Sequence, residues 1–316
     1  MYDAACPSEP QPLSCETPQP LALQRAVGEL AVSVRRRDDA SVLEGLRQAG
    51  CLKARFPRAV VPGWIDVVTL NTSGGIAGGD RLDSAFDVRS GARASIAAQA
   101  AERFYRALPG GAASQVRTRI AVEAGAAAEW LPQETILFDR CALYRRLEVD
   151  LAEDAWFLGV ESLVFGRAAM GETVEQASLR DLIRVRRGDR LLWHDAVRLE
   201  GNVAATLRRK AIADGARAVA TIVHVAPQAE ATLDTVRSAL HAHLARIAGE
   251  VDAQSASGEG HAPTRSHNVT KAAASAWNGM LIARILAPDS AALRVAVVAV
   301  LRVLRHDRPL PRVWMC

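Results

Sequence analysis

The sequence contains few cysteines, and their spacing excludes two common uses of this residue. There are five cysteines, an odd number, and no two of them form a CxxC pair. Two lie within the first twenty residues and another is residue 316. This arrangement fits neither a disulfide framework nor a closed structural zinc site. A protein of a reducing compartment is the simplest interpretation.

Long apolar runs are also absent. The longest candidate, residues 291–304, is interrupted by Arg294 and Arg302, and a membrane-spanning helix needs about 18 or more apolar residues. The first twenty residues carry five prolines and lack the basic start and apolar centre of a secretory signal. We therefore expect a cytoplasmic protein that does not enter a membrane. Residues 1–20 are predicted to be a disordered tail, and 21–316 a single domain.

Lysine is scarce, with three residues in a chain of 316, although the formal net charge is +4. Most arginines are scattered among acidic residues, as in VRTRIAVE at 116–123. Basic clusters occur only at 35–37 and 207–210. Because nucleic-acid binding usually requires a basic stripe or patch, we expect no nucleic-acid partner.

Apolar and polar residues alternate over short runs between about residues 24 and 226, which is typical of β-strands. A pair of such runs within 181–199 has Gly188-Asp189 at its centre, which suits a hairpin turn. Other clear runs are 65–70, 114–123 and 145–152.

Three segments of this region resemble one another. Each has a strand, a two-residue turn, an alanine and a second strand, and they begin at residues 87, 121 and 150. Their spacing is too irregular for a true solenoid repeat, but it is compatible with hairpins stacked in a layered or helical sheet.

The pattern changes in the last third of the chain. The expected elements, in order, are a helix, a mobile loop, a strand and a second helix, at 231–250, 252–267, 276–288 and 289–305. Gly249 is predicted to close the first helix, and Asn278-Gly279 suits a turn next to the strand. Asp289 and Ser290 are suitable caps for the second helix.

The stretch NTSGGIAGGDRL, residues 71–82, has four glycines within six positions. A P-loop would need lysine and a hydroxyl residue after the last glycine, where Asp80 and Arg81 stand. A dinucleotide fingerprint would open a helix, but a strand-like segment follows. We expect a structural turn whose glycines take positive φ or allow close backbone approach, and which sets Asp80 and Arg81 in place. These glycines are Gly74, Gly75, Gly78 and Gly79.

A second dense stretch, EWLPQETILFD, contains three acids: Glu129, Glu134 and Asp139. Two carboxylates near 134–139 could perform acid/base chemistry, as in a carbohydrate-active β-sheet enzyme. The sequence does not fix their separation, so this alternative stays open. There is no GxSxG motif and no His/Cys cluster with the spacing of a closed metal site.

Six stretches in a fixed order resemble the urease accessory protein UreD family, called UreH in some bacteria. They are 71–82, 100–107, 129–139, 165–172, 274–288 and 310–314. The resemblance covers the chain from about residue 40 to the end and implies a mainly β, β-helix-like fold. The predicted fold class is therefore a layered, β-helix-like stack of short strands with two α-helices in the C-terminal half.

The resemblance also implies a function, which is a urease maturation chaperone and not an enzyme. Such a protein binds the urease apoprotein together with UreF and UreG, and helps deliver nickel to the urease active site. UreG is the GTPase of that system. The resemblance implies no tightly bound cofactor, only nickel in transit.

A nickel route needs weak oxygen ligands, because a closed Cys/His site would trap this ion. Acids within or beside the matching stretches are therefore candidates to line it, since buried acids in apolar strands need a partner. These candidates are Asp80, Glu134, Asp139, Glu161 and Glu172. Besides the four glycines, the matching stretches single out motif or structural residues: Arg81, Tyr105, Arg106, Trp130, Pro132, Gln133, Gly166, Arg167, Gly171 and Trp314. An aromatic residue so near the C-terminus is expected to pack on the body or a partner.

Overall fold

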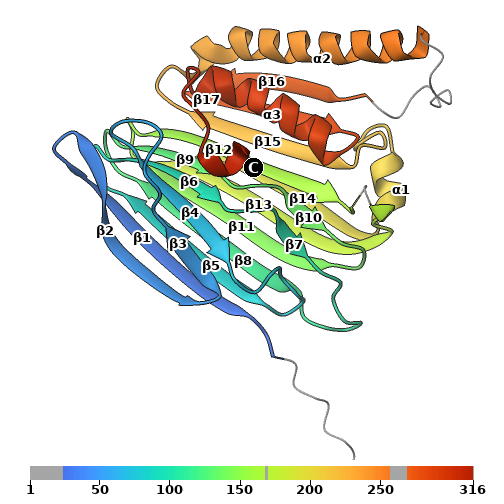
Figure 1. Cartoon of the computed structure of the whole chain (residues 1–316), viewed down its shortest axis with the longest axis horizontal. Helices are drawn as coiled ribbons and strands as arrows, with labels where there is room; N and C mark the ends of the chain where they lie inside the picture. Colours follow the sequence, from blue (N-terminus) through green and yellow to red (C-terminus); the bar gives the residue numbers. More distant parts are fainter. Residues whose placement is uncertain (1–23, 168–169, 257–268, 316) are drawn as a thin grey trace, which may run out of the picture.

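The computed structural model describes residues 24–167, 170–256 and 269–315. Two β-sheets lie against each other, and two long helices lie together on the outer side of one of them (Figure 1). The chain is mainly β, as the sequence predicts. The predicted tail at 1–20 lies outside the described residues.

One sheet has seven strands in the order β14-β13-β11-β8-β5-β1-β2. The five central strands run parallel, whereas β2 and β14 run antiparallel at the two edges. Gly188 and Asp189 connect β13 to β14 in the predicted hairpin. The bounds are β1 Val27–Arg37, β2 Ala40–Gly50, β5 Arg81–Val88, β8 Ser114–Val122, β11 Ala142–Leu151, β13 Gln176–Arg187 and β14 Arg190–Asn202.

The other sheet has ten strands, with the main order β16-β17-β15-β12-β9-β6-β4-β3. Two short strands, β7 and β10, pair beside the end of β12. The strands β4, β6, β9 and β12 run parallel. The bounds are β3 Leu52–Arg55, β4 Ile65–Asn71, β6 Arg93–Ala98, β7 Glu102–Phe104, β9 Ala127–Leu131, β10 Thr135–Leu137, β12 Trp156–Phe165, β15 Ala218–Val225, β16 Lys271–Trp277 and β17 Met280–Ala287.

The three similar segments are corners where the chain passes from one sheet to the other: β5 to β6, β8 to β9 and β11 to β12. The prediction that they are hairpins is wrong, because the two strands of a segment do not pair with each other. The chain winds as a coil through both sheets, and each strand pairs in parallel with the equivalent strand of the next turn. The corners stack on one another, and the alanine of each corner is buried: Ala92, Ala126 and Ala155. The β-helix-like fold class is thus confirmed.

Two apolar cores hold the layers together. The larger core fills the space between the sheets and includes Phe86, Ile120 and Val149. The second lies between the ten-stranded sheet and the helices, where Leu158 and Leu301 are buried. Alternation along β11 and β13 places one side chain in two within the first core, which is why the period-two pattern is so clear there.

The two long helices are α2, Leu233–Ala256, and α3, Ser290–Leu304. Helix α3 begins as predicted, with Asp289 as N-cap accepting a hydrogen bond from the backbone N–H of Ala292 at 2.8 Å. Helix α2 follows a 3₁₀ turn, η2 Ala229–Thr232, and continues through Gly249. The predicted helix end is therefore wrong, since one glycine costs a helix only about 1 kcal/mol.

The predicted loop at 252–267 starts too early, because residues 252–256 belong to α2, and residues from 257 lie outside the described part. Asn278 and Gly279 form a turn with positive φ, 54° and 71°, but it joins two paired strands. The sequence pattern does not reveal the first of these, β16, which is rich in alanine. The sequence also misses the short helix α1, Val203–Arg208, and the final 3₁₀ turn, η3 Arg312–Met315.

Candidate functional site

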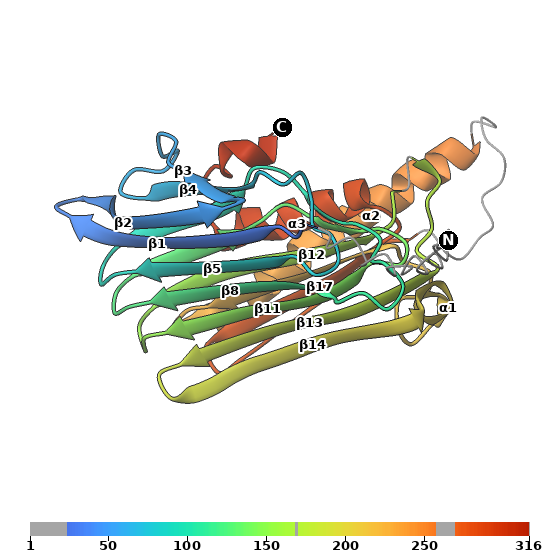
Figure 2. The same cartoon turned by 90° about the horizontal axis from the view of Figure 1, so that it is seen from below.

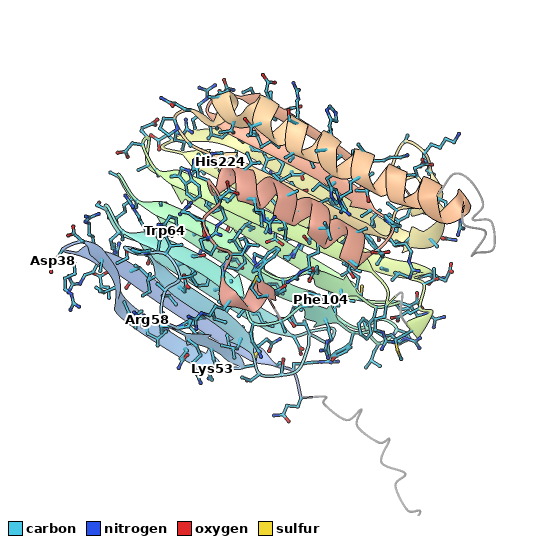
Figure 3. The ribbon with its side chains drawn as sticks, turned by 45° about the horizontal axis from the view of Figure 1, so that its top comes forward. Asp38, Lys53, Arg58, Trp64, Phe104 and His224 are labelled. Atoms are coloured by element: carbon cyan, nitrogen blue, oxygen red, sulfur yellow. The ribbon has the colours of Figure 1, made fainter. Side chains whose placement is uncertain are left out.

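A cavity of about 380 Å³ lies between the two sheets. Ser84 and Thr118 contribute hydroxyl groups from the seven-stranded sheet, and Thr69 contributes one from the other. Phe104, labelled in Figure 3, is a buried part of the lining. The charged side chains of the lining include Glu102, Arg103, Arg145 and Glu161. The cavity is therefore polar along much of its wall, although apolar strands surround it.

Arg145 is the centre of a buried ionic network at this cavity. Its Nε and Nη2 atoms donate to the two carboxylate oxygens of Asp181, at 2.8 and 2.6 Å. Its Nη1 lies 2.7 Å from Oε2 of Glu161 and also donates to the hydroxyl of Thr135 at 2.8 Å. The other oxygen of Glu161 accepts the indole N–H of Trp130 at 2.7 Å. The network thus joins β11 and β13 of one sheet to β12 of the other.

Two carboxylates share one guanidinium here, which leaves a formal charge of −1. Burial raises the pKa of Glu161 above its usual value of 4.5, although Arg145 acts in the opposite direction. Burial alone would lower the pKa of Arg145, but the charges of Asp181 and Glu161 raise it, so the guanidinium stays protonated. Because buried uncompensated charge is costly, the network favours a further proton or cation.

Glu102 supplies another carboxylate to the lining. Asn71 Nδ2 lies 3.2 Å from both of its oxygens. Burial raises the pKa of Glu102 above its usual value of 4.5. The cavity therefore offers carboxylate, amide and hydroxyl oxygens at several points along its wall.

The C-terminal segment holds one wall of the cavity from outside. Gln133 lines the cavity, donates through Nε2 to the carbonyl oxygen of Val313 at 2.7 Å, and accepts from Arg294 Nη1 at 2.8 Å. Arg294 also donates to the carbonyl oxygen of Trp314, and its guanidinium carbon lies 5.0 Å from the centre of the indole ring. Trp314 is buried against the body, as expected from its place near the C-terminus.

Glu129 belongs to a separate buried network. Its oxygens accept from Arg305 Nε and Nη2 at 2.9 and 3.1 Å, and from the hydroxyl of Ser95 at 2.8 Å. Arg308 Nη2 lies 3.2 Å from the same carboxylate. The guanidinium carbon of Arg308 lies 4.5 Å from the centre of the Trp64 ring; Trp64 is labelled in Figure 3. Glu129 therefore anchors the segment after α3 to the ten-stranded sheet.

The glycine loop has the structural geometry that the sequence suggests. Gly74 and Gly75 have φ of 79° and 144°. A Cβ atom at Gly75 would lie 2.4 Å from the ring of Tyr105, whose hydroxyl donates to the carbonyl oxygen of Gly74 at 2.7 Å. At Gly78, a Cβ atom would lie 3.0 Å from Ala107 Cβ. Close approach to neighbouring residues therefore requires glycine here.

Asp80 holds this loop in place. Its two oxygens accept from the backbone N–H groups of Ala26 and Ala77, at 2.8 and 2.7 Å. Gly79, just before it, has a φ of 90°, and Arg81 begins β5 with an exposed side chain. Asp80 is buried, but it does not line the cavity.

The other candidate acids are also engaged away from the cavity. Glu134 lies 3.4 Å from Arg294 Nη1. Asp139 accepts from two backbone N–H groups at the start of β13, at 2.9 Å each. Glu172 binds Arg167 Nε at 2.7 Å. Of the five candidate acids, only Glu161 lines the cavity.

The remaining motif residues shape the turns around β10 and β12. Gly166 and Gly171 have positive φ, 79° and 68°. The Arg167 guanidinium lies 4.2 Å from the centre of the Phe138 ring. Arg106 forms an isolated β-bridge near the same turns. Pro132 lines the cavity next to the residue held by the C-terminal segment.

The described residues contain no group of three or more His, Cys, Asp or Glu side chains placed to hold a metal ion. None of the described helices is long and apolar enough to cross a membrane. The enzyme alternative has no geometric support, because the acids of the 129–139 stretch do not line the cavity and have separate partners.

The comparison with known proteins decides the family. The sequence profile described as UreD urease accessory protein matches residues 26–315. The chain belongs to this family. It is similar to UreD of Dinoroseobacter shibae, with 43% identity over 310 residues, 97% of this chain and 98% of the relative. UreD 2 of Methylorubrum populi is 41% identical over 304 residues, 95% and 94% of the two chains. UreD of Azorhizobium caulinodans is 42% identical over 291 residues, 92% and 97%. Membership supports a role in urease maturation.

The sequence interpretation missed Arg145 and Asp181, which form the centre of the network in this UreD protein. In β11, Arg145 points to the same side of the sheet as Leu143 and Leu147, and all three side chains are buried. Asp181 likewise replaces an apolar residue at the inward phase of β13. A charged residue at a position of the alternation that is otherwise apolar needs a partner in the protein interior. The sequence contains this signal, because both residues interrupt an apolar row.

Proposed function

We propose that this UreD protein is a non-catalytic chaperone that binds the urease apoprotein together with UreF and UreG and helps deliver nickel to the urease active site. It works in the cytoplasm and holds no cofactor tightly. Nickel is its cargo, and the cavity between the sheets is the part of the molecule that the cargo enters.

The oxygen-rich lining supports this proposal. Nickel stands high in the affinity order of divalent ions, so a thiolate or imidazole cage would hold it too tightly for transfer. Hydroxyl, amide and carboxylate oxygens bind it weakly and leave part of its water shell. Glu161, Glu102 and the hydroxyls of Ser84 and Thr118 are ligands of this type.

The network around Arg145 limits how tightly a cation is held. With its charge of −1, it attracts a divalent ion but cannot neutralise it, and Arg145 repels the ion from one side. Asp181 is occupied by two hydrogen bonds from the guanidinium. Asp181 does not line the cavity, whereas Glu161 does. Glu161 is thus the acid of this network that faces the cargo, beside Glu102 elsewhere on the wall, and this is the observation that carries the proposal.

The test is the nickel content of urease co-expressed with variants of this chain. Glu161→Ala and Glu161→Gln should lower nickel per urease, while Asp39→Ala, whose side chain is fully exposed at the β1–β2 turn, should leave it unchanged. Deleting the chain altogether should leave urease assembled but without nickel. Unchanged nickel in both Glu161 variants would reject the role of the cavity, and fully metallated urease after deletion would reject the function.

A further inference from the structure

Four adjacent strands of the seven-stranded sheet collect arginines on their outer side. The parallel register aligns residues that are far apart in sequence, so Arg119, Glu148 and Arg184 form one row across β8, β11 and β13. We call this surface the arginine face, defined by Arg117, Arg119, Arg146, Arg180, Arg184, Arg186 and Arg198. The coil of the fold thus concentrates arginines that look scattered along the chain.

The arginine face is not neutralised by its own acids. The neighbouring strand β5 adds Arg81, Asp83 and Asp87 on the same side, so the whole surface has a formal charge of +3. Within the face itself, the acids are Glu148, Asp150 and Glu200. These acids pair with the other four arginines of the face. Arg117, Arg119 and Arg180 are exposed and make no ion pair within the described part of the chain. They are the groups available to a partner.

The surface is open to solvent. Helices α2 and α3 pack on the other sheet, and the short helix α1 lies at one end of β13 and β14 (Figure 2). Neighbouring strands in a sheet lie about 4.8 Å apart, so the arginines of the four strands form a broad array of guanidinium groups.

The chemistry of the face favours a protein with exposed carboxylates over a nucleic acid. Arginine binds carboxylates with two parallel hydrogen bonds and is enriched at protein interfaces. Glu148 and Asp150 lie between the arginines, where they would repel a continuous phosphate backbone. No lysine occurs on these four strands.

We propose that the arginine face is the surface by which this chain docks on the urease apoprotein, through aspartate and glutamate side chains of that protein. The inference rests on the proposed function, since urease is the partner that the family description provides. Binding through such a face is electrostatic and weakens as salt screens the charges, over a Debye length of about 10 Å at 0.1 M salt.

The experiment compares urease retention by tagged chains co-expressed with urease apoprotein, UreF and UreG. The test variant is Arg117→Glu/Arg180→Glu. The matched control is Arg35→Glu/Arg37→Glu, which reverses two exposed arginines of β1 in the same sheet. We expect the test variant to retain about tenfold less urease than wild type, with the control unchanged. A milder Arg117→Gln/Arg180→Gln variant should show an intermediate loss, and thermal unfolding should show that each variant is folded.

Equal retention by the test variant, the control and wild type would overturn the inference. Two other results would do the same: a self-association of wild type that the test variant abolishes, or binding of a short DNA duplex at physiological salt through these arginines. If wild type itself retains no urease, the proposed function fails. If wild type and the test variant both retain urease, the proposed function stands and only the assignment of the arginine face as the docking surface is wrong.

Discussion

Trp314 donates its indole N–H to the carbonyl oxygen of Leu131 at 3.0 Å, although 183 residues separate the two in the sequence. Leu131 ends β9, and the residues after it form a wall of the cavity. The C-terminal segment is therefore part of the construction of the candidate site and not an appendage of the last helix.

Replacing Trp314 should destabilise the whole fold. Trp314→Ala removes a buried indole, and we expect the free energy of unfolding to fall by about 3–5 kcal/mol. Trp314→Phe keeps most of the apolar surface and should cost less, about 1–2 kcal/mol for the lost hydrogen bond. Urea unfolding measures both values. Met315→Ala is the control, since that side chain is 79% exposed, and a cost similar to that of Trp314→Ala would contradict the argument.

The pair formed by Glu129 and Arg305 gives a second prediction. Arg305→Met leaves a fully buried carboxylate with fewer partners, and we expect a loss of about 3–5 kcal/mol in unfolding free energy. Arg302→Met, at an exposed position of α3, should change it by about 0.5 kcal/mol or less. The double variant Glu129→Gln/Arg305→Met should recover part of the loss. Strict additivity of the two single costs would show that the side chains are not coupled.

The glycine loop offers a matched pair of substitutions. Gly74→Ala meets no atom within 4 Å, so it should cost only about 1 kcal/mol for positive φ. Gly75→Ala also drives a methyl group into the ring of Tyr105 and should cost about 2–4 kcal/mol. In a Tyr105→Ala background, the Gly75→Ala cost should fall to that of Gly74→Ala. If it stays the same, the ring is not the obstacle.

His224 should make stability depend on pH. Its imidazole is buried beside Trp156, with Nδ1 3.2 Å from the carbonyl oxygen of Phe157. Burial lowers its pKa from 6.5 to about 4. The unfolded chain therefore binds the proton more readily, so the contribution of His224 is present above pH 6.5 and is lost as pH falls toward 4. That contribution is about 3 kcal/mol.

The measurement for His224 is urea unfolding at several pH values. Wild type should lose about 3 kcal/mol more than His224→Leu between pH 7 and pH 4. The exposed residue His194 on β14 provides the control: His194→Leu should keep the pH dependence of wild type. Parallel stability curves for wild type and His224→Leu would contradict the assignment.

Local patterns predict local structure well in this chain. The Asp289 cap and the β13–β14 turn depend on neighbouring residues, and both occur where the sequence places them. The hairpin interpretation of the three corners failed for a different reason. A strand, a short turn and a second strand look the same in sequence whether the two strands pair with each other or with the next turn of the coil.

The site was harder to predict because its geometry depends on distant pairs. As an acid in an apolar strand, Glu161 is a candidate from sequence alone, and it does line the cavity. Asp80 and Asp139 are candidates on the same ground, but their carboxylates accept hydrogen bonds from backbone N–H groups, most of which belong to residues distant in sequence. The partner of Glu129 is Arg305, 176 residues away, and no periodicity in a single sequence connects the two.

The antiparallel strands at the borders of both sheets have a consequence for the extent of the coil. Here β2, β3, β14 and β16 all run against their neighbours. The reversal ends the parallel winding at these borders, so the number of turns in the coil is set within one polypeptide.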